Sequence, residues 1–172
     1  MGSGDRAPIR GTLNHASVVA LAIDQDGPLA GVMIEGASGS GKSDLVLRLI
    51  EACPWQRTLL VADDSALVSV EGDRIIARPP GTIEGEIEIR GIGIATVPFR
   101  DMVRLRAIVR LSSNIRRMPD PETASPAGAG GHALPVLTID PFQLSAPAKL
   151  RYGVRSIVAG HLPAGRQDKP LN

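Results

Sequence analysis

The stretch Gly36-Ala37-Ser38-Gly39-Ser40-Gly41-Lys42-Ser43 fits the phosphate-binding loop pattern G-x-x-x-x-G-K-[ST]. An apolar run at 29–34 precedes the loop and predicts a buried strand. Residues 44–51 follow the loop and carry apolar side chains at helical spacing, which predicts a helix. Because a phosphate loop works between a strand and a helix, the sequence predicts a nucleotide-binding protein.

The residue types of this loop suit the binding of phosphate groups. Glycines let backbone N–H groups converge on phosphate oxygens, and the helix N-terminus behind them adds a favourable dipole. We expect Lys42 to reach the β- and γ-phosphates and Ser43 to supply a hydroxyl ligand to Mg²⁺. The alternative is a Gly/Ser-rich connector, which would require neither Lys42 nor Ser43.

Composition limits the class of protein. The 172 residues are enough for one domain, and with 2% aromatic residues its core must consist of Val, Ile, Leu and Ala. A net charge of +1 indicates neither a nucleic-acid nor an anionic-membrane partner. The single Cys53 cannot form an internal disulfide, and no apolar run approaches the roughly 20 residues that span a bilayer. We therefore expect a cytoplasmic protein that binds neither nucleic acid nor membrane.

Apolar periodicity predicts a chain rich in strands. Extended segments are expected at 18–23, 29–34, 58–62, 66–70, 74–77, 86–90, 92–97, 103–111 and 134–139, with a last helix at 148–159. Segment 103–111 follows a period of two that places Val103, Leu105, Ala107, Val109 and Leu111 on one face. With few helices to cover crossovers, the predicted fold class is α/β, a mixed or largely antiparallel sheet around a central phosphate-loop helix.

The predicted organisation is one phosphate-loop domain at 12–159. Residues 1–11 are expected to be a flexible N-terminus, and 160–172 a flexible tail with nothing to bury. Within the domain, segment 112–133 is rich in Pro, Gly and small residues and is predicted to be a mobile loop.

The predicted strand 58–62 ends at Asp63-Asp64. Phosphoryl transfer requires a carboxylate near the γ-phosphate, either to hold Mg²⁺ or to accept the proton of an attacking hydroxyl. Successive strand residues point to opposite faces, so a regular strand would aim only one aspartate at the nucleotide. A bend at the strand end would bring both near; the alternative is that they merely terminate the strand.

Four segments together resemble the catalytic domain of the bacterial HPr kinase/phosphorylase family. They are Asn14-His15-Ala16-Ser17, the phosphate loop with Asp44, Val61-Ala62-Asp63-Asp64 and, most specifically, Glu88-Ile89-Arg90-Gly91-Ile92-Gly93-Ile94. Order and spacing match across 12–97 and more loosely to about 155. Family members phosphorylate a serine of the small phosphocarrier protein HPr with ATP and Mg²⁺, and many reverse the step with inorganic phosphate. The resemblance implies a phosphate-loop α/β fold related to phosphoenolpyruvate carboxykinase, commonly assembled into hexamers.

The resemblance also implies roles for residues at the nucleotide. His15 matches the active-site histidine and Lys42 the phosphate-loop lysine, while Ser43 and Glu88 match the magnesium ligands. The pair Asp63-Asp64 matches the acidic pair that holds the catalytic base, and Asp64 is the favoured proton acceptor.

Three further cations enter through the same resemblance. Arg117, or its neighbour Arg116, matches an active-site arginine that stabilises charge on the transferring phosphoryl group. Segment 145–151 is loosely similar to a family stretch tied to dephosphorylation, which makes Lys149 and Arg151 candidates for phosphate contact; the alternative is that both are surface residues.

The resemblance implies an ATP- and Mg²⁺-dependent serine kinase that acts on HPr or a homologous phosphocarrier. Such an enzyme works with or without the reverse phosphorylase activity, and a homo-oligomer is expected. The sequence begins close to the catalytic motifs, so a compact form without the N-terminal domain of full-length members is expected. Two alternatives stay open. One is a kinase of the same fold for another protein or peptide serine or a small hydroxyl compound, and the other is a regulator that binds nucleotide without turnover.

Overall fold

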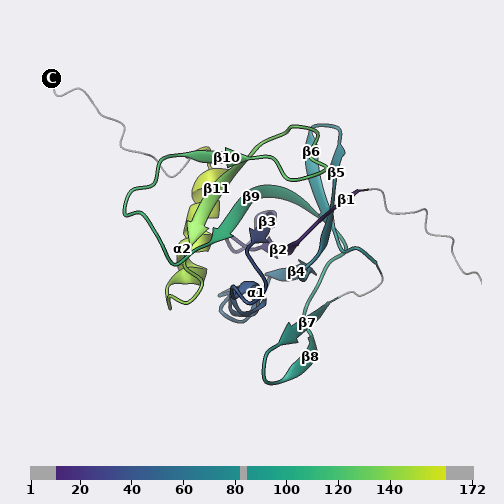
Figure 1. Ribbon diagram of the computed structural model, residues 1–172, viewed down its shortest axis with the longest axis vertical. Helices are drawn as coiled ribbons and strands as arrows, with labels where there is room; N and C mark the ends of the chain where they lie inside the picture. The colour runs from purple at the N-terminus through teal and green to yellow at the C-terminus, as the bar shows by residue number, and fades with distance from the viewer. Residues whose placement is uncertain (1–10, 82–84, 162–172) are drawn as a thin grey trace, which may run out of the picture.

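The computed structural model describes residues 11–81 and 85–161. Most of the two predicted flexible ends, residues 1–10 and 162–172, lies outside this part of the chain. Two helices, α1 (Lys42–Glu51) and α2 (Ala146–Val158), lie against a large sheet (Figure 1). In the described ranges, neither helix is long and apolar enough to cross a membrane.

The large sheet has nine strands. They are β1 (Thr12–Asn14), β2 (Ala16–Leu21), β3 (Ala30–Glu35), β4 (Leu59–Ala62), β5 (Ala66–Glu71), β6 (Arg74–Arg78), β9 (Val103–Leu111), β10 (Glu122–Ala124) and β11 (Leu134–Ile139). The main path runs β1-β5-β6-β9-β3-β2-β4, and β11 joins β9 to β10. A separate hairpin consists of β7 (Glu86–Ile89) and β8 (Gly93–Thr96).

The sheet is mixed, as the scarcity of helices predicts. Strand β9 lies parallel to β3 and β11, whereas the pairs β2-β3, β2-β4, β5-β6 and β6-β9 are antiparallel. The predicted extended segments at 18–23 and 29–34 form the antiparallel hairpin of β2 and β3, which leads into the phosphate loop. The mixed α/β class predicted for the chain is confirmed.

Two apolar cores lie on opposite faces of the central strands. Val19 and Leu21 of β2 pack with both helices, whereas Val18 and Ala20, which point to the opposite face, pack toward β5 and β6. Figure 1 shows α1 and α2 on one side of the strands, while β5 and β6 curl away from them. A fully buried leucine such as Leu21 stabilises the fold by about 1.5–3 kcal/mol.

Strand β9 does not keep the strict alternation that its sequence predicts. Leu105 pairs with Gly31 and Ala107 with Val32, so Arg106 is the extra residue of a β-bulge. The bulge shifts the phase of the strand: Leu105 packs on the β5 side, and Ala107 packs on the helix side. The single apolar face predicted for 103–111 is therefore divided between the two cores.

The predicted mobile loop at 112–133 contains regular structure. Strand β10 pairs antiparallel with β11, and Ala129 is fully buried. The Asn14 side chain donates to the Ala127 carbonyl at 2.9 Å and accepts from the Ala127 N–H at 3.1 Å. Sequence reasoning did not predict this regular structure within the segment, because the contacts come from parts of the chain distant in sequence.

Candidate active site

The phosphate loop connects β3 to α1, as its sequence predicts. Gly39 and Gly41 have φ angles of 76° and 93°, in the left-handed region that favours glycine. Gly41 is the N-cap of α1, and no side chain of the described residues caps that helix. The first N–H groups of α1 are therefore open to an anion, which the helix dipole favours.

Lys42 lies inside the loop. Its side chain is 5% exposed, and its Nζ donates to the carbonyls of Gly36 at 2.9 Å and Ala37 at 3.2 Å. The same Nζ is 3.5 Å from Oδ1 of Asp64. A buried ammonium requires such partners, and here they hold the charge beneath the loop where phosphates would bind.

The end of β4 turns both aspartates toward the loop. Asp64 has a φ of 62°, a left-handed conformation that Asp tolerates better than most residues and that breaks the alternation of the strand. Asp63 accepts a hydrogen bond from the Ser43 Oγ, with distances of 3.0 and 3.1 Å to its two oxygens. Asp64 faces Lys42 instead. The two carboxylates thus have different partners, as a bend at the strand end allows.

Ser17 holds the two aspartates, and sequence reasoning assigned it no role. Its Oγ donates to Oδ1 of Asp63 at 2.8 Å and accepts from the backbone N–H of Asp64 at 3.2 Å. Ser17 is fully buried within β2, where every residue is buried. A lone serine in an apolar run was the available signal, because a buried hydroxyl must find partners.

His15 is a second neighbour of the Asp64 carboxylate. Its Nε2 is 3.6 Å from Oδ1 of Asp64, and both side chains are more than half exposed. Oδ1 of Asp64 therefore contacts both the buried ammonium of Lys42 and an exposed imidazole. A carboxylate in this position is open to a large substrate.

The oxygens of Ser43 and Asp63 suit Mg²⁺. A hydroxyl and a carboxylate are hard ligands, and Mg²⁺ in nucleotide sites takes one or two protein oxygens and completes its shell with phosphates and water. The described ranges contain no group of three or more His, Cys, Asp or Glu side chains that would form an all-protein cage. The donor set therefore fits a metal shared with a phosphate ligand.

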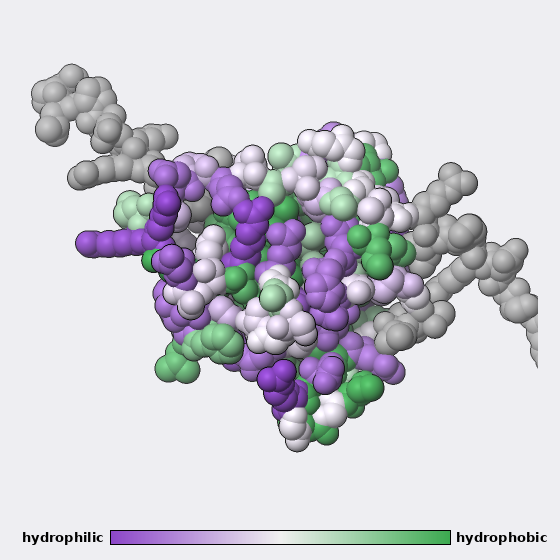
Figure 2. Space-filling model, viewed as in Figure 1, coloured by the Kyte–Doolittle hydropathy of each residue, from purple (hydrophilic) through white to green (hydrophobic). Residues whose placement is uncertain are grey.

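The structure does not join Glu88 to this pair. Glu88 is exposed on β7, and none of the hydrogen bonds or ion pairs between described residues links it to Ser43 or Asp63. Figure 2 shows hydrophobic atoms at the foot of the molecule, over the hairpin of β7 and β8, where Ile92 and Ile94 are exposed. Arg90 reaches toward the loop from this hairpin: its Nη2 is 4.0 Å from where a Cβ on Gly39 would lie.

The predicted active-site arginines also lie outside the cluster. Arg117 is exposed between β9 and β10, and Arg116 pairs with Asp120 at 3.6 Å. In the described part of the chain, neither has a hydrogen bond or ion pair with the loop or the two aspartates.

The two cations at the start of α2 have other partners. Arg151 is 7% exposed and donates to the carbonyls of Ala22 at 3.0 Å and Leu49 at 3.2 Å. The Arg151 guanidinium is therefore directed into the interior beside the C-terminal half of α1, away from the phosphate loop at the other end of that helix. Lys149 is exposed, and its Nζ donates to Oε1 of Gln143 at 2.6 Å.

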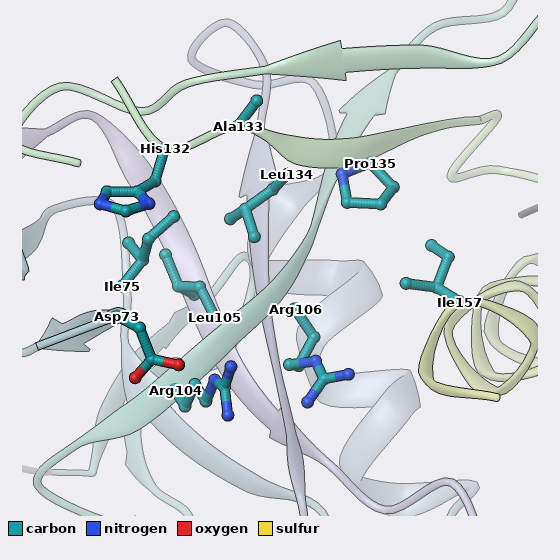
Figure 3. Close-up of a pocket in the computed structure, with 10 residues that line it drawn as sticks. All are labelled: Asp73, Ile75, Arg104, Leu105, Arg106, His132, Ala133, Leu134, Pro135 and Ile157. Carbon is teal, nitrogen blue, oxygen red and sulfur yellow. The ribbon is translucent and has the colours of Figure 1, made fainter. Parts of the chain in front are cut away.

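A separate cavity of about 320 Å³ lies beside the β9 bulge (Figure 3). Its lining includes Arg104, Arg106, His132 and Asp73. Because Leu105, another lining residue, pairs with Gly31 near the start of β3, the cavity lies at the end of that strand away from the phosphate loop. It is distinct from the candidate active site.

Comparison with known proteins agrees with this geometry. A solved structure of the Hpr(Ser) kinase/phosphatase from Coxiella burnetii superposes with a TM-score of 0.70 and 24% sequence identity, covering 87% of this chain and 92% of that chain. At this identity the likeness shows the shared fold. The family described as the HPr Serine kinase C-terminal domain matches residues 15–112, which include β2, the phosphate loop, both aspartates and the hairpin of β7 and β8. The chain therefore belongs to the HPr serine kinase C-terminal domain family.

Proposed function

We propose that this protein is a serine kinase that uses ATP and Mg²⁺ and acts on HPr or a homologous phosphocarrier. The observation that carries the proposal is the meeting of the phosphate loop with the acidic pair at the end of β4. Family membership supports a kinase-like activity and favours a phosphocarrier as the acceptor.

In this proposal the phosphate loop and Lys42 bind the nucleotide. The N–H groups at the start of α1 and the Lys42 ammonium bind phosphate oxygens, and Ser43 and Asp63 hold Mg²⁺. When bound, the metal neutralises charge on the phosphates. Glu88 remains a proposed second ligand from the family pattern, although the contacts of Ser43 favour Asp63.

Asp64 is the proposed base. Its carboxylate is 63% exposed and can meet a serine of a protein substrate, whereas Asp63 is engaged by two hydroxyls. In a direct in-line transfer the serine Oγ forms a bond to the γ-phosphorus, the bond to the bridging oxygen of ATP breaks, and the serine proton passes to Asp64. His15 and Lys42 flank this carboxylate and keep it oriented. Arg117 or Arg116 is proposed to approach the transferring group when the substrate is bound.

The test is transfer of labelled γ-phosphate from Mg-ATP to a purified HPr-like phosphocarrier. The intact chain is compared with Lys42→Ala, Asp64→Asn and a matched control, Asp26→Asn, at an exposed aspartate in the turn after β2. We expect label on a carrier serine, lost in the first two variants and kept in the control. Label that reaches only another acceptor would move the proposal to that substrate. ATP binding without any transfer, unchanged in Asp64→Asn, would indicate a nucleotide-responsive regulator. Light scattering on the same sample tests the proposed homo-oligomer.

A further inference from the structure

The turn between β11 and α2 presents an exposed aromatic side chain. Phe142 is 72% exposed in a chain with one tryptophan, one tyrosine and two phenylalanines. Leu144, two residues later, is fully exposed. Single exposed apolar side chains are ordinary on a protein surface, so the place of this ring, and not its exposure, indicates a role.

The ring lies against the phosphate loop. Its Cε1 and Cζ atoms are each 3.4 Å from where a Cβ on Gly41 would lie, and the Pro141 Cβ is equally close. Gly41 is the N-cap of α1, so the ring adjoins the point where the loop becomes helix. Figure 1 shows the turn that leads from β11 into α2 near the α1 helix.

A polar clamp fixes this turn to α1. The Arg48 guanidinium donates to the carbonyls of Pro141 and, at 3.4 Å, Gln143, and it is itself paired with Asp44 at 2.9 Å. The N–H of Phe142 donates to Oδ1 of Asp140 at 3.0 Å. The backbone that carries the ring is therefore held in place, as a preorganised binding surface requires.

We propose that Phe142 is the stacking platform for the base of the nucleotide whose phosphates lie in the loop at 36–43. This inference rests on the proposed nucleotide binding and names the subsite for the base. A base is joined through the ribose to phosphates held at the start of α1, and the ring borders the loop at Gly41, within reach of that base. An aromatic face stacks with any base, because every base has a π-face. The subsite therefore accepts adenine and guanine alike.

The test measures binding by calorimetry, without turnover. The ligands are Mg-ATP, Mg-GTP and Mg-tripolyphosphate, which has three phosphates and no base. The proteins are the intact chain, Phe142→Ala, Phe142→Trp and the matched control Leu144→Ala. We expect Phe142→Ala to bind ATP and GTP about tenfold more weakly and tripolyphosphate with unchanged affinity, since loss of one base stack has an effect of this order. Phe142→Trp and Leu144→Ala should keep the affinity for ATP.

Four outcomes would overturn the platform. An ATP affinity unchanged in Phe142→Ala would show that the ring does not meet the base, and if phosphocarrier labelling falls at the same time the ring serves the protein acceptor. Equal losses for ATP and tripolyphosphate would mean that Phe142 acts on the shape of the loop. An equal loss in Leu144→Ala would assign the effect to the turn as a whole. An intact chain that binds none of the three ligands would instead refute the proposed nucleotide function, and the platform with it.

Discussion

Two buried cations lie beside α1, and they do different things. Lys42, 5% exposed, begins the helix and bonds to loop carbonyls. Arg151, 7% exposed, comes from α2 and bonds to the carbonyls of Leu49 and Ala22 near the other end of α1. Both are charges removed from water, and burial alone does not distinguish them.

Their partners do. Lys42 adds to its carbonyls the exposed carboxylate of Asp64, beside helix N–H groups that are open to an anion. Arg151 links α2 to α1 and to the end of β2 through its two hydrogen bonds. Burial lowers the pKa of its guanidinium, and the nearby charge of Cys53 opposes this effect. A buried cation therefore indicates a binding site when an exposed carboxylate and open N–H groups lie beside it, and a structural role when its hydrogen bonds go to buried backbone carbonyls alone.

Removing the functional cation should give the larger effect on chemistry. We expect Lys42→Ala to lower phosphate transfer by about 10²–10³-fold, the usual loss for one donor to a developing charge. The free energy of unfolding should change less than in Arg151→Leu, because the carbonyls of Gly36 and Ala37 lie in a partly exposed loop where water replaces the lost donor. Transfer rates and urea unfolding of the same preparation check both parts. A protein that unfolds more readily and keeps its transfer rate would reverse the distinction.

Removing the structural cation should give the opposite pattern. Arg151→Leu leaves two buried carbonyls without their donor, so we expect the free energy of unfolding to fall by about 3 kcal/mol. The folded fraction should bind Mg-ATP as before. Arg155→Leu is the matched control one turn later, where an exposed side chain donates to the Ile23 carbonyl at 2.8 Å and a loss of about 1 kcal/mol is expected. Weaker ATP binding in Arg151→Leu at full stability would place this arginine in the site.

A smaller effect should follow from the buried hydroxyl that positions the aspartates. Ser17→Ala removes a donor to Asp63 and an acceptor for the N–H of Asp64, so we expect transfer to fall about 10–100-fold, as for supporting partners of metal sites. If Ser17 acts through Asp63, the Mg²⁺ concentration for half-maximal transfer must rise. Ser156→Ala, a hydroxyl on α2 bonded within its own helix, is the control. An unchanged Mg²⁺ requirement would reduce Ser17 to a packing residue.

The features that sequence predicted are those with local causes. The strand, loop and helix around 36–43 each follow from the residues they contain, and the acidic pair follows from its place at a strand end. The mixed sheet follows from counting strands and helices. The family resemblance placed Asp64 beside the nucleotide, and the structure brings it to Lys42.

The features that sequence missed depend on distant partners. Ser17 on β2 bonds to Asp63 at the end of the neighbouring strand β4, and Asn14 bonds to Ala127, 113 positions away. Phe142 contacts the loop at Gly41 from the turn between β11 and α2. The bulge at Arg106 likewise depends on how β9 pairs with β3, which the sequence of β9 alone does not determine. Arginine is a residue type that often binds phosphate, and the packing of α2 directs the side chain of Arg151 into the interior instead.

Cys53, beside Arg151 at the C-terminal end of α1, should make the free energy of unfolding depend on pH. Burial raises the pKa of its thiol, but hydrogen bonds from the Thr58 hydroxyl and the backbone N–H groups of Arg57, Trp55 and Thr58 outweigh burial and lower the pKa from 9.0 to about 7. Because the pKa is lower in the folded state, the unfolded chain binds more protons between these values, and stability must rise with pH across that window. The gain is lost as the pH falls through 7. Between pH 7 and about pH 8.5 we expect an increase of about 1.5 kcal/mol in the intact chain that Cys53→Ala lacks, measured by urea unfolding under reducing conditions. Parallel pH profiles for the two proteins would show that the thiol stays neutral beside Arg151. The carbonyls of Ala22 and Leu49 would then be the partners that stabilise the buried guanidinium.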